Sequence, residues 1–160
     1  KTEVGPLINH NEVNRVEEWV NDAIAKGAKI LTGGKRIGAS CFEPTVILNA
    51  SDDAIISQKE IFGPVVCIYS YKTLDEAIAR ANSLEVSFQA AVFTKNIDTA
   101  LKAVKRLNAT AVMVNDHTAF RVDWMPFGGA RISGLGMGGM PYSMEEMSNE
   151  KMMVIKSPVL

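Results

Sequence analysis

Short apolar runs rich in β-branched residues alternate along this chain with stretches of helical periodicity, and this alternation is the strongest constraint on its fold. Strands are predicted over residues 44–48, 64–71, 89–94 and 110–115. Strands that are apolar throughout and alternate with helices are typical of a parallel sheet that is covered on both faces. We therefore predict an α/β fold for most of the chain.

Local sequence signals define the helices that we expect around these strands. Apolar residues recur at helical spacing over residues 11–26, where Asn9 or Asn11 is a candidate N-cap. Thr73 and Glu76 have the spacing of a capping box and open a second helix. One face of a third helix carries Ala100, Leu101, Val104 and Leu107.

The character of the sequence changes after Asn115. Loop and glycine residues dominate to Gly139, a short helix is predicted near residues 143–147 because Pro141 delays it, and residues 151–156 are predicted as a terminal strand. That strand lies apart from the α/β pattern. We interpret it as a candidate for pairing with another subunit.

The glycine-rich stretch contains the pattern G-x-G-x-x-G at Gly134, Gly136 and Gly139. This pattern binds a dinucleotide when a buried strand runs into it and a helix starts at its last glycine, within a β-α-β unit. The residues before the pattern do not read as a strand, Pro141 follows it, and the sequence continues only to Leu160. We therefore interpret it as a flexible or closely packed loop rather than as a phosphate cradle.

Composition and charge argue against several classes of protein. The hydrophobic share is 47%, the charged share is 22% and the formal net charge is −1, so no nucleic-acid or membrane partner is indicated. No apolar run is long enough to cross a bilayer, and the start of the sequence does not resemble a signal peptide. Cys41 and Cys67 have no metal-ligand spacing, and a reducing cytoplasm is the expected location. The missing initial Met indicates a piece of a longer protein.

Glu60 is the residue for which the sequence most directly suggests a chemical role. It lies in KEIFGPVV, residues 59–66, three residues before a Gly63-Pro64 turn and ahead of a strand that is predicted to be buried. A carboxylate held at such a corner can accept two hydrogen bonds from a vicinal diol, so a ribose is a natural partner. The alternative is a solvent-exposed glutamate in an ordinary turn.

Several motifs in a fixed order give the chain a wider resemblance. KEIFGPVV is followed by LDEAIARANS, AAVFT, VMVN and MPFGG…SGLG, and it is preceded by VGPLI, GAKILTGG and FEPTVI. In this order the motifs resemble the NAD(P)-dependent aldehyde dehydrogenase family over essentially the whole chain. The resemblance implies that residues 1–139 form part of the α/β catalytic domain, its latter half. It also implies that residues 140–160 form a C-terminal arm with an oligomerisation strand, as in a homodimer or homotetramer.

The same resemblance implies roles for particular residues. Glu60 would bind the hydroxyls of the nicotinamide ribose of NAD or NADP, and Phe62 would pack beside it, while an upstream region of the same protein would bind most of the cofactor. A cysteine thiolate, an oxyanion-hole asparagine and a glutamate base carry out the family's reaction. All three would lie upstream of this chain. We therefore predict that the isolated chain is inactive and that Cys41 and Cys67 are structural.

The loop of residues 115–129 would line the entrance for a small aldehyde. Arg121 would favour an anionic substrate, because its guanidinium matches a carboxylate, phosphate or phosphonate. A structural ion pair between Arg121 and Asp116 or Asp123 is equally compatible with the sequence. His117 would either contact the substrate or buttress the loop.

Trp124 and Phe127 would form the apolar walls of this entrance. The loop sequence resembles the branch that contains the lactaldehyde, non-phosphorylating glyceraldehyde-3-phosphate and phosphonoacetaldehyde dehydrogenases. Val86-Ser87-Phe88 departs from the Tyr-Gly-Leu that is common in the broad family. A second class of function, a non-catalytic assembly or binding module that retains the fold, is also compatible with a sequence that lacks the nucleophile.

Overall fold

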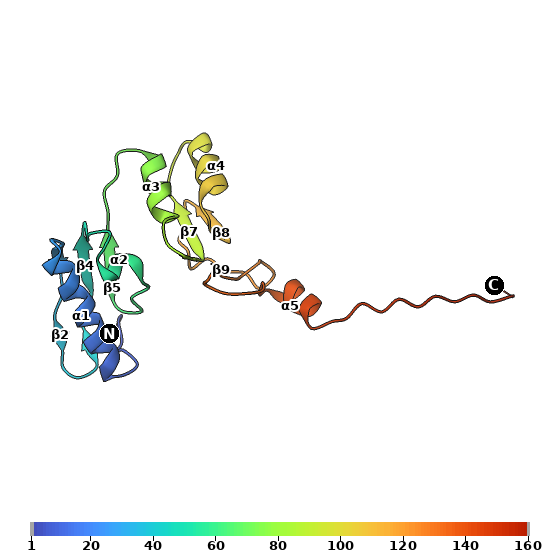
Figure 1. Cartoon of the computed structure of the whole chain (residues 1–160), viewed down its shortest axis with the longest axis horizontal. Coiled ribbons are helices and arrows are strands. Elements are labelled where there is room, and N and C mark those ends of the chain that lie inside the picture. The colour runs from blue at the N-terminus through green and yellow to red at the C-terminus, as the bar shows by residue number, and fades with distance from the viewer. Residues whose placement is uncertain (1, 160) are drawn as a thin grey trace. The chain divides into compact units, whose positions relative to one another are not determined.

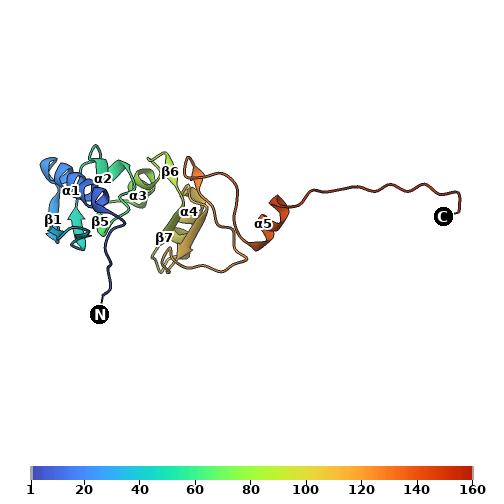
Figure 2. The same cartoon turned by 90° about the horizontal axis from the view of Figure 1, so that it is seen from below.

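A computed structural model describes residues 2–159, which form two compact units. The first unit runs to Lys72 and the second begins at Thr73. Figure 1 and Figure 2 show the elements of each unit from two directions, with the first unit coloured blue to green. Within residues 2–159, no helix is long and apolar enough to cross a membrane.

The first unit is built around helix α1 (His10–Ala25), which confirms the helix predicted from apolar periodicity. Asn9 caps this helix, because its Oδ1 accepts a hydrogen bond of 3.1 Å from Glu12 N. Gly27, with a φ of 90°, follows its end in the left-handed conformation that glycine adopts without strain. The buried face of the helix consists of Val13, Val16, Val20 and Ala23.

A three-stranded sheet shares its core with α1. The strands are β1 (Lys29–Thr32), β4 (Thr45–Leu48) and β5 (Val65–Ile68), in the order β1-β4-β5. β4 and β5 are parallel, with Ile47 opposite Cys67, whereas β1 runs antiparallel to β4. The remaining elements are β2 (Arg36–Ile37), β3 (Cys41–Phe42) and α2 (Ile55–Gln58).

Strand β5 is less buried than the sequence predicts. Val66 is 60% exposed and Ile68 is exposed too, so the expectation of a strand covered on both faces is wrong for the described residues. β5 is the edge strand of its sheet. Only the side of the strand that carries Val65 and Cys67 packs against the core.

The second unit contains another parallel pair of strands. β7 (Gln89–Val92) and β8 (Ala111–Val114) are parallel, and helix α4 (Ile97–Arg106) lies between them in sequence. Helix α3 (Leu74–Ala81) begins at the predicted cap, where the Thr73 hydroxyl accepts a hydrogen bond of 3.2 Å from Glu76 N. The remaining elements are β6 (Val86–Ser87), β9 (Ala130–Arg131) and α5 (Met140–Glu146).

The predicted α/β class is confirmed as a mixed α/β fold. The parallel pairs β4–β5 and β7–β8 have the orientation that the sequence predicts. They belong to separate sheets, one in each unit, and β1 adds an antiparallel strand to the first. The four predicted strands therefore pair in parallel as expected, but they form two separate pairs rather than one sheet, and the antiparallel strand β1 was not among the predicted strands.

Helix α4 buries a different face from the predicted one. Ala100 and Ala103 are buried, whereas Leu101 is 60% exposed and Val104 is exposed as well. The small side chains face inward. The larger ones form an apolar stripe, to which Ile97 also belongs, that residues 2–159 leave uncovered.

The C-terminal segment differs from the prediction at the start of its helix, and its predicted strand is untested. Helix α5 begins directly after Gly139, because Pro141 lies in its first turn, where the helix needs no backbone N–H donor. Residues 151–156 have no strand partner within residues 2–159, and Figure 1 shows them in an extended segment beyond α5. A strand forms only by pairing with another strand. The oligomerisation strand and the domain boundary after Gly139 therefore stay predictions.

Candidate functional site

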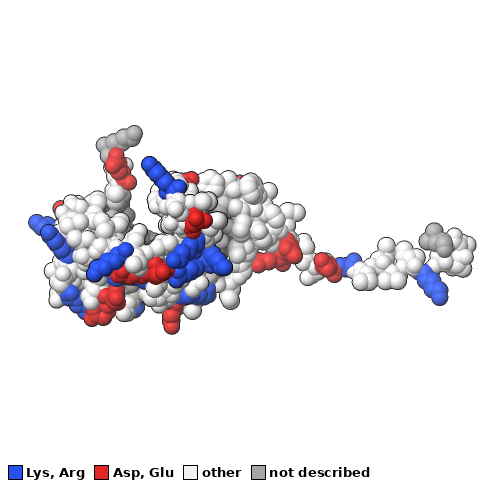
Figure 3. Space-filling model, turned by 90° about the horizontal axis from the view of Figure 1, so that it is seen from above, with Lys and Arg blue, Asp and Glu red and all other residues white. Residues whose placement is uncertain are grey.

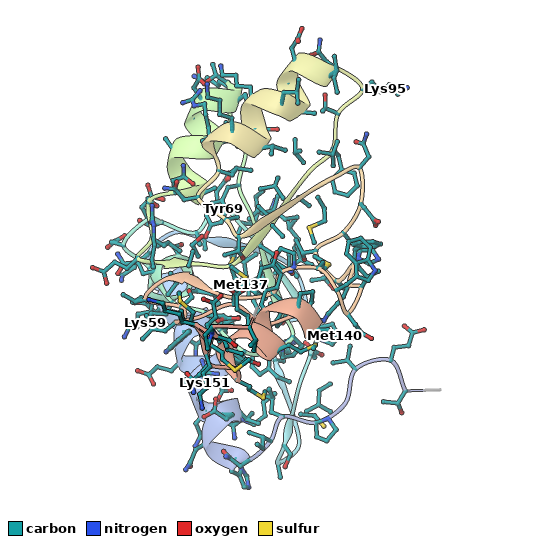
Figure 4. The ribbon with its side chains drawn as sticks, turned by 90° about the vertical axis from the view of Figure 1, so that its right-hand side faces the viewer. Lys59, Tyr69, Lys95, Met137, Met140 and Lys151 are labelled. Atoms are coloured by element: carbon teal, nitrogen blue, oxygen red, sulfur yellow. The ribbon has the colours of Figure 1, made fainter. Side chains whose placement is uncertain are left out.

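Glu60 lies on the short segment that connects α2 to β5. Its side chain is exposed, and the described part of the chain offers its carboxylate no hydrogen bond or ion pair. The preceding residue, Lys59, is labelled in Figure 4 and is exposed as well. Both carboxylate oxygens of Glu60 are therefore free to accept hydrogen bonds from a ligand.

The backbone next to Glu60 is fastened to helix α1. Arg15 Nη2 donates a hydrogen bond of 2.6 Å to Ile61 O. A Cβ on Gly63 would lie 2.8 Å from Val16 Cγ2, so only glycine lets the chain pass this close to the helix. The Ile61 side chain packs against the core of the first unit. A hydrogen bond, a close approach and a half-buried side chain thus hold the corner that carries Glu60.

Phe62 has a backbone conformation that is rare for its residue type. Its φ is 44°, in the left-handed region that a bulky side chain adopts only at a cost, and the residue is 73% exposed. Residues held in this way cluster at functional sites. Glu60 and Phe62 flank Ile61, so a free carboxylate and an apolar ring lie exposed on either side of a half-buried side chain that packs against the core.

Arg15, which fastens this corner, is itself fixed in place. Its Nε donates a hydrogen bond of 2.8 Å to Glu12 Oε2, and its guanidinium carbon lies 4.6 Å from the centre of the Trp19 ring. The sequence analysis did not identify Arg15. The helical spacing of Glu12, Arg15 and Trp19 is a visible signal, but the carbonyl that Arg15 binds is 46 positions away.

In the second unit, Arg121 rests on an aromatic ring of its own loop. Its guanidinium carbon lies 3.9 Å from the centre of the Phe127 ring. Phe127 in turn meets Phe88 edge to face, with ring centres 5.0 Å apart and an interplanar angle of 87°. Among the described residues, Arg121 has no ion pair with Asp116 or Asp123, so the alternative of a structural ion pair receives no support.

Within residues 2–159, neither His117 nor Trp124 makes a hydrogen bond, an ion pair or a cation–π contact with Arg121. His117 N donates a hydrogen bond of 2.8 Å to Asp116 Oδ1, and its ring Nε2 lies 3.9 Å from the same oxygen. Trp124 is 71% exposed, and Arg121 is exposed too. The described residues therefore do not by themselves form the closed entrance that the sequence analysis expected.

Gly138 and Gly139 pack closely against the end of this loop. Phe127 N donates a hydrogen bond of 2.9 Å to Gly138 O, and Gly138 N donates one of 2.7 Å to Phe127 O. A Cβ on Gly139 would lie 2.5 Å from Met125 O. The strand before these glycines, β9, has two residues and pairs antiparallel with β6. Of the two interpretations of the glycine motif, the geometry supports the closely packed loop, and Figure 4 labels Met137 within it.

The two cysteines lie in strands of the first unit, and both are free thiols. Burial raises the pKa of the Cys67 thiol above its ordinary value, which disfavours the reactive thiolate. Cys41 lies opposite Ile37 in the β2–β3 hairpin. Across residues 2–159, no group of three His, Cys, Asp or Glu side chains could hold a metal ion.

Charges of both signs are interspersed on the face that Figure 3 shows. Asp75 pairs with Lys102 at 2.8 Å and also with Arg106. These pairs lower the pKa of the Asp75 carboxyl, mainly through the hydrogen bond from Lys102. Few charged side chains follow α5 (Figure 3).

The sequence matches the model of the aldehyde dehydrogenase family over residues 1–153. It is 43% identical over 155 residues to 3-sulfolactaldehyde dehydrogenase from Priestia aryabhattai. It is 45% identical over 155 residues to lactaldehyde dehydrogenase from Methanocaldococcus jannaschii. These alignments cover 97% of this chain but 32% and 33% of the relatives. The chain therefore spans about a third of the length of the curated relatives it matches.

The structure is also similar to a solved structure, that of glyceraldehyde-3-phosphate dehydrogenase GapN from Methanocaldococcus jannaschii in complex with NADP. The TM-score is 0.87 and the sequence identity 44%, over 93% of this chain and 32% of that chain. The mixed α/β fold described above is thus the fold of this region in a solved aldehyde dehydrogenase structure.

Proposed function

This chain belongs to the aldehyde dehydrogenase family, and on that premise we propose that it is the C-terminal part of an enzyme that oxidises a small aldehyde to a carboxylate with NAD or NADP. The observation that carries this proposal is the Glu60 corner. It presents a free carboxylate and an exposed ring at the position of the family motif, and α1 holds it in place.

Uncovered apolar surface supports the proposal that further parts of the protein complete this one. Val66 on β5 and the stripe of Ile97, Leu101 and Val104 on α4 are exposed. Exposed apolar surface of this extent is typical of a face that another part of the protein buries. The relatives are about three times as long as this chain, which leaves ample sequence for that cover.

In the proposed enzyme, NAD or NADP supplies the hydride acceptor when it is bound. Glu60 accepts hydrogen bonds from the hydroxyls of the nicotinamide ribose, and Phe62 packs beside that ribose. A corner that is already fixed loses little conformational entropy on binding, so the ribose is oriented at small cost. A region outside this chain binds the rest of the cofactor.

The nucleophilic cysteine, the oxyanion-hole asparagine and the glutamate base of the proposed reaction lie outside this chain. Cys67 is a poor substitute, because its raised pKa keeps the sulfur protonated near neutral pH. We therefore expect the isolated chain to have no dehydrogenase activity. The two free thiols are compatible with the reducing cytoplasm that we propose as its location.

For the substrate, we propose a small aldehyde that carries an anionic group, bound by Arg121 in a loop that Trp124, Phe127 and His117 line. Two of the relatives support this choice by their names, since sulfolactaldehyde carries a sulfonate and glyceraldehyde 3-phosphate a phosphate. Lactaldehyde, named for the third relative, is neutral. A guanidinium without an ion-pair partner among the described residues favours the anionic substrates.

Specificity measurements on the full-length enzyme test this proposal. We expect kcat/KM to be higher for phosphonoacetaldehyde and glyceraldehyde 3-phosphate than for lactaldehyde and propanal. A charge-assisted contact is typically worth about 1.5–3 kcal/mol, so Arg121→Leu should lower kcat/KM about ten- to a hundredfold for the anionic aldehydes only. An equal loss on all four substrates would show that Arg121 is structural.

The arm of residues 140–160 is proposed to pair through residues 151–156 with another subunit, in a homodimer or homotetramer. The same exposed segment also favours the second candidate function, a non-catalytic assembly module that retains the fold. The intact mass of the natural protein separates the two candidates. A longer chain with a cysteine-bearing catalytic segment supports the enzyme, and a natural chain of this length supports the module.

A further inference from the structure

We propose that Phe88 is a positioning residue for Arg121, and that it acts through the ring of Phe127. This inference rests on the proposed function, in which Arg121 binds the anionic group of an aldehyde. It adds a specificity-determining residue that lies outside the loop of residues 115–129 and acts on Arg121 indirectly.

The geometry of the rings carries the first step. The Arg121 guanidinium lies over the Phe127 ring, with its carbon 3.9 Å from the ring centre, so that the ring face supports the cation. Phe88 meets the same ring at 87° with centres 5.0 Å apart, which is the favourable edge-to-face arrangement. The Phe127 ring is therefore held between a cation and a second ring.

Backbone contacts fix the two rings relative to each other. Thr110 Oγ1 lies 2.7 Å from Phe88 O and 2.6 Å from Gly128 O, within hydrogen-bonding distance of both. Thr110 N also donates a hydrogen bond of 2.8 Å to Phe88 O. One threonine thus joins the backbone of Phe88 to the residue that follows Phe127, while Gly138 exchanges two hydrogen bonds with Phe127 itself.

Few interactions besides the Phe127 ring fix the position of the Arg121 side chain. The residue is exposed, and within residues 2–159 its side chain makes no hydrogen bond or ion pair besides the contact with the Phe127 ring. A free arginine side chain samples many rotamers and loses that freedom when it binds an anion. A ring that is fixed in one orientation limits the rotamers before binding. Removing Phe88 would therefore reduce affinity for the anionic group without removing the charge.

The variant that tests this inference is Phe88→Leu in the full-length enzyme, because leucine keeps an apolar side chain but removes the ring. Phe93→Leu is the matched control, since Phe93 follows β7, is exposed and makes no aromatic-pair or cation–π contact among the described residues. Both substitutions are also made in the Arg121→Leu background. The readouts are kcat and KM for phosphonoacetaldehyde and for propanal, together with the melting temperature.

We expect Phe88→Leu to raise KM for phosphonoacetaldehyde about two- to tenfold, with kcat and the kinetics of propanal unchanged. Phe93→Leu should change neither substrate. In the Arg121→Leu background, Phe88→Leu should have no further effect on either substrate, because the residue through which it acts is missing.

The possible failures are distinguishable. If Arg121→Leu alone leaves the preference for phosphonoacetaldehyde intact, the proposed anionic substrate site is wrong. If Arg121→Leu abolishes the preference but Phe88→Leu changes nothing, only the positioning role is wrong. An equal loss on both substrates with a lower melting temperature, or an effect of Phe88→Leu that persists without Arg121, would overturn the inference as well.

Discussion

Arg15 Nη2 lies 2.6 Å from Ile61 O, so a side chain of α1 holds the segment that carries Glu60 and Phe62. The guanidinium is paired with Glu12 and stacked on Trp19, so it does not have to be ordered when the hydrogen bond forms. The position of the proposed ribose site therefore depends on helix α1 as well as on the family motif.

We predict that Arg15→Met loosens this corner. It leaves the Ile61 carbonyl without its donor, and the free energy of unfolding should fall by about 1–3 kcal/mol. Arg36→Met is the matched control, because Arg36 also bonds to α1, at Asn14 and Glu17, but makes no hydrogen bond or ion pair with residues 59–64. Hydrogen exchange of residues 59–64 is the measurement. Equal exchange in the two variants would show that Arg15 does not hold the corner.

Glu60→Gln is predicted to slow hydride transfer in the full-length enzyme by about tenfold or more, because glutamine replaces a charged acceptor by one neutral carbonyl oxygen. Single-turnover formation of NADH or NADPH measures this step directly. Lys59→Gln, a neighbouring exposed change of charge, should leave the rate unchanged. If Glu60→Gln forms reduced cofactor at the wild-type rate, Glu60 does not orient the ribose.

The features that could be predicted from the sequence are the local ones. The capping of α1 by Asn9 and of α3 by Thr73 follows from contacts between residues three positions apart. The predicted start of α5 is wrong for a local reason too, because a proline delays a helix only beyond its first turn, and Pro141 lies within that turn.

The features that could not be predicted depend on distant parts of the chain or on parts outside it. Helical spacing identifies the apolar residues of α4, but it does not tell which of them the fold buries. Leu101, for example, stays exposed. Likewise, the motif around Glu60 was visible, whereas its anchor Arg15 and the ring that Phe88 presents to Phe127 depend on tertiary packing. No periodicity or spacing rule contains that information.

Acid is predicted to weaken the contact between α1 and α2 through Asp22. Its Oδ2 accepts a hydrogen bond of 2.9 Å from Ile55 N, and Lys26 lies 3.0 Å from its other oxygen. Mainly because of the bond from Ile55, the pKa of the Asp22 carboxyl is below its ordinary value of 3.8. A lowered folded pKa stabilises the protein above the unfolded value, and this contribution is lost as the pH falls through the folded pKa.

The melting temperatures of the wild type and of Asp22→Asn at pH 7 and pH 3 test this prediction. The variant should melt lower than the wild type at pH 7, and the difference should shrink at pH 3, which lies below the ordinary pKa of the carboxyl and therefore in the range where its contribution is being lost. Glu18→Gln, which changes an exposed carboxylate of the same helix, is the matched control. A constant difference between wild type and Asp22→Asn would contradict the assignment.

Cys67 is predicted to react more slowly with iodoacetamide than Cys41 at pH 7.5. Burial raises the pKa of the Cys67 thiol, so a smaller fraction is thiolate, the form that attacks the reagent. Peptide mass spectrometry over a time course should show alkylation of the Cys41 peptide first, with a rate ratio of several-fold. Cys67→Ala should remove the slow phase only. Equal rates, or faster labelling of Cys67, would reopen the question of a nucleophile within this chain.

The isolated chain is predicted to self-associate or to be of low stability. Met152 is 86% and Val154 82% exposed in a segment with no strand partner within residues 2–159, and such a segment offers unpaired backbone donors and acceptors to another copy. The exposed apolar stripe of α4 is a second surface through which copies of the chain can associate. Sedimentation velocity over a range of concentrations, with thermal unfolding of the same samples, measures both properties.

Removing residues 151–160 should reduce self-association while leaving the low stability, because the α4 stripe and the edge of β5 remain uncovered. A monomer of the intact chain that melts sharply at a high temperature would mean that these surfaces need no cover, and that the chain is an independent domain rather than part of a larger one.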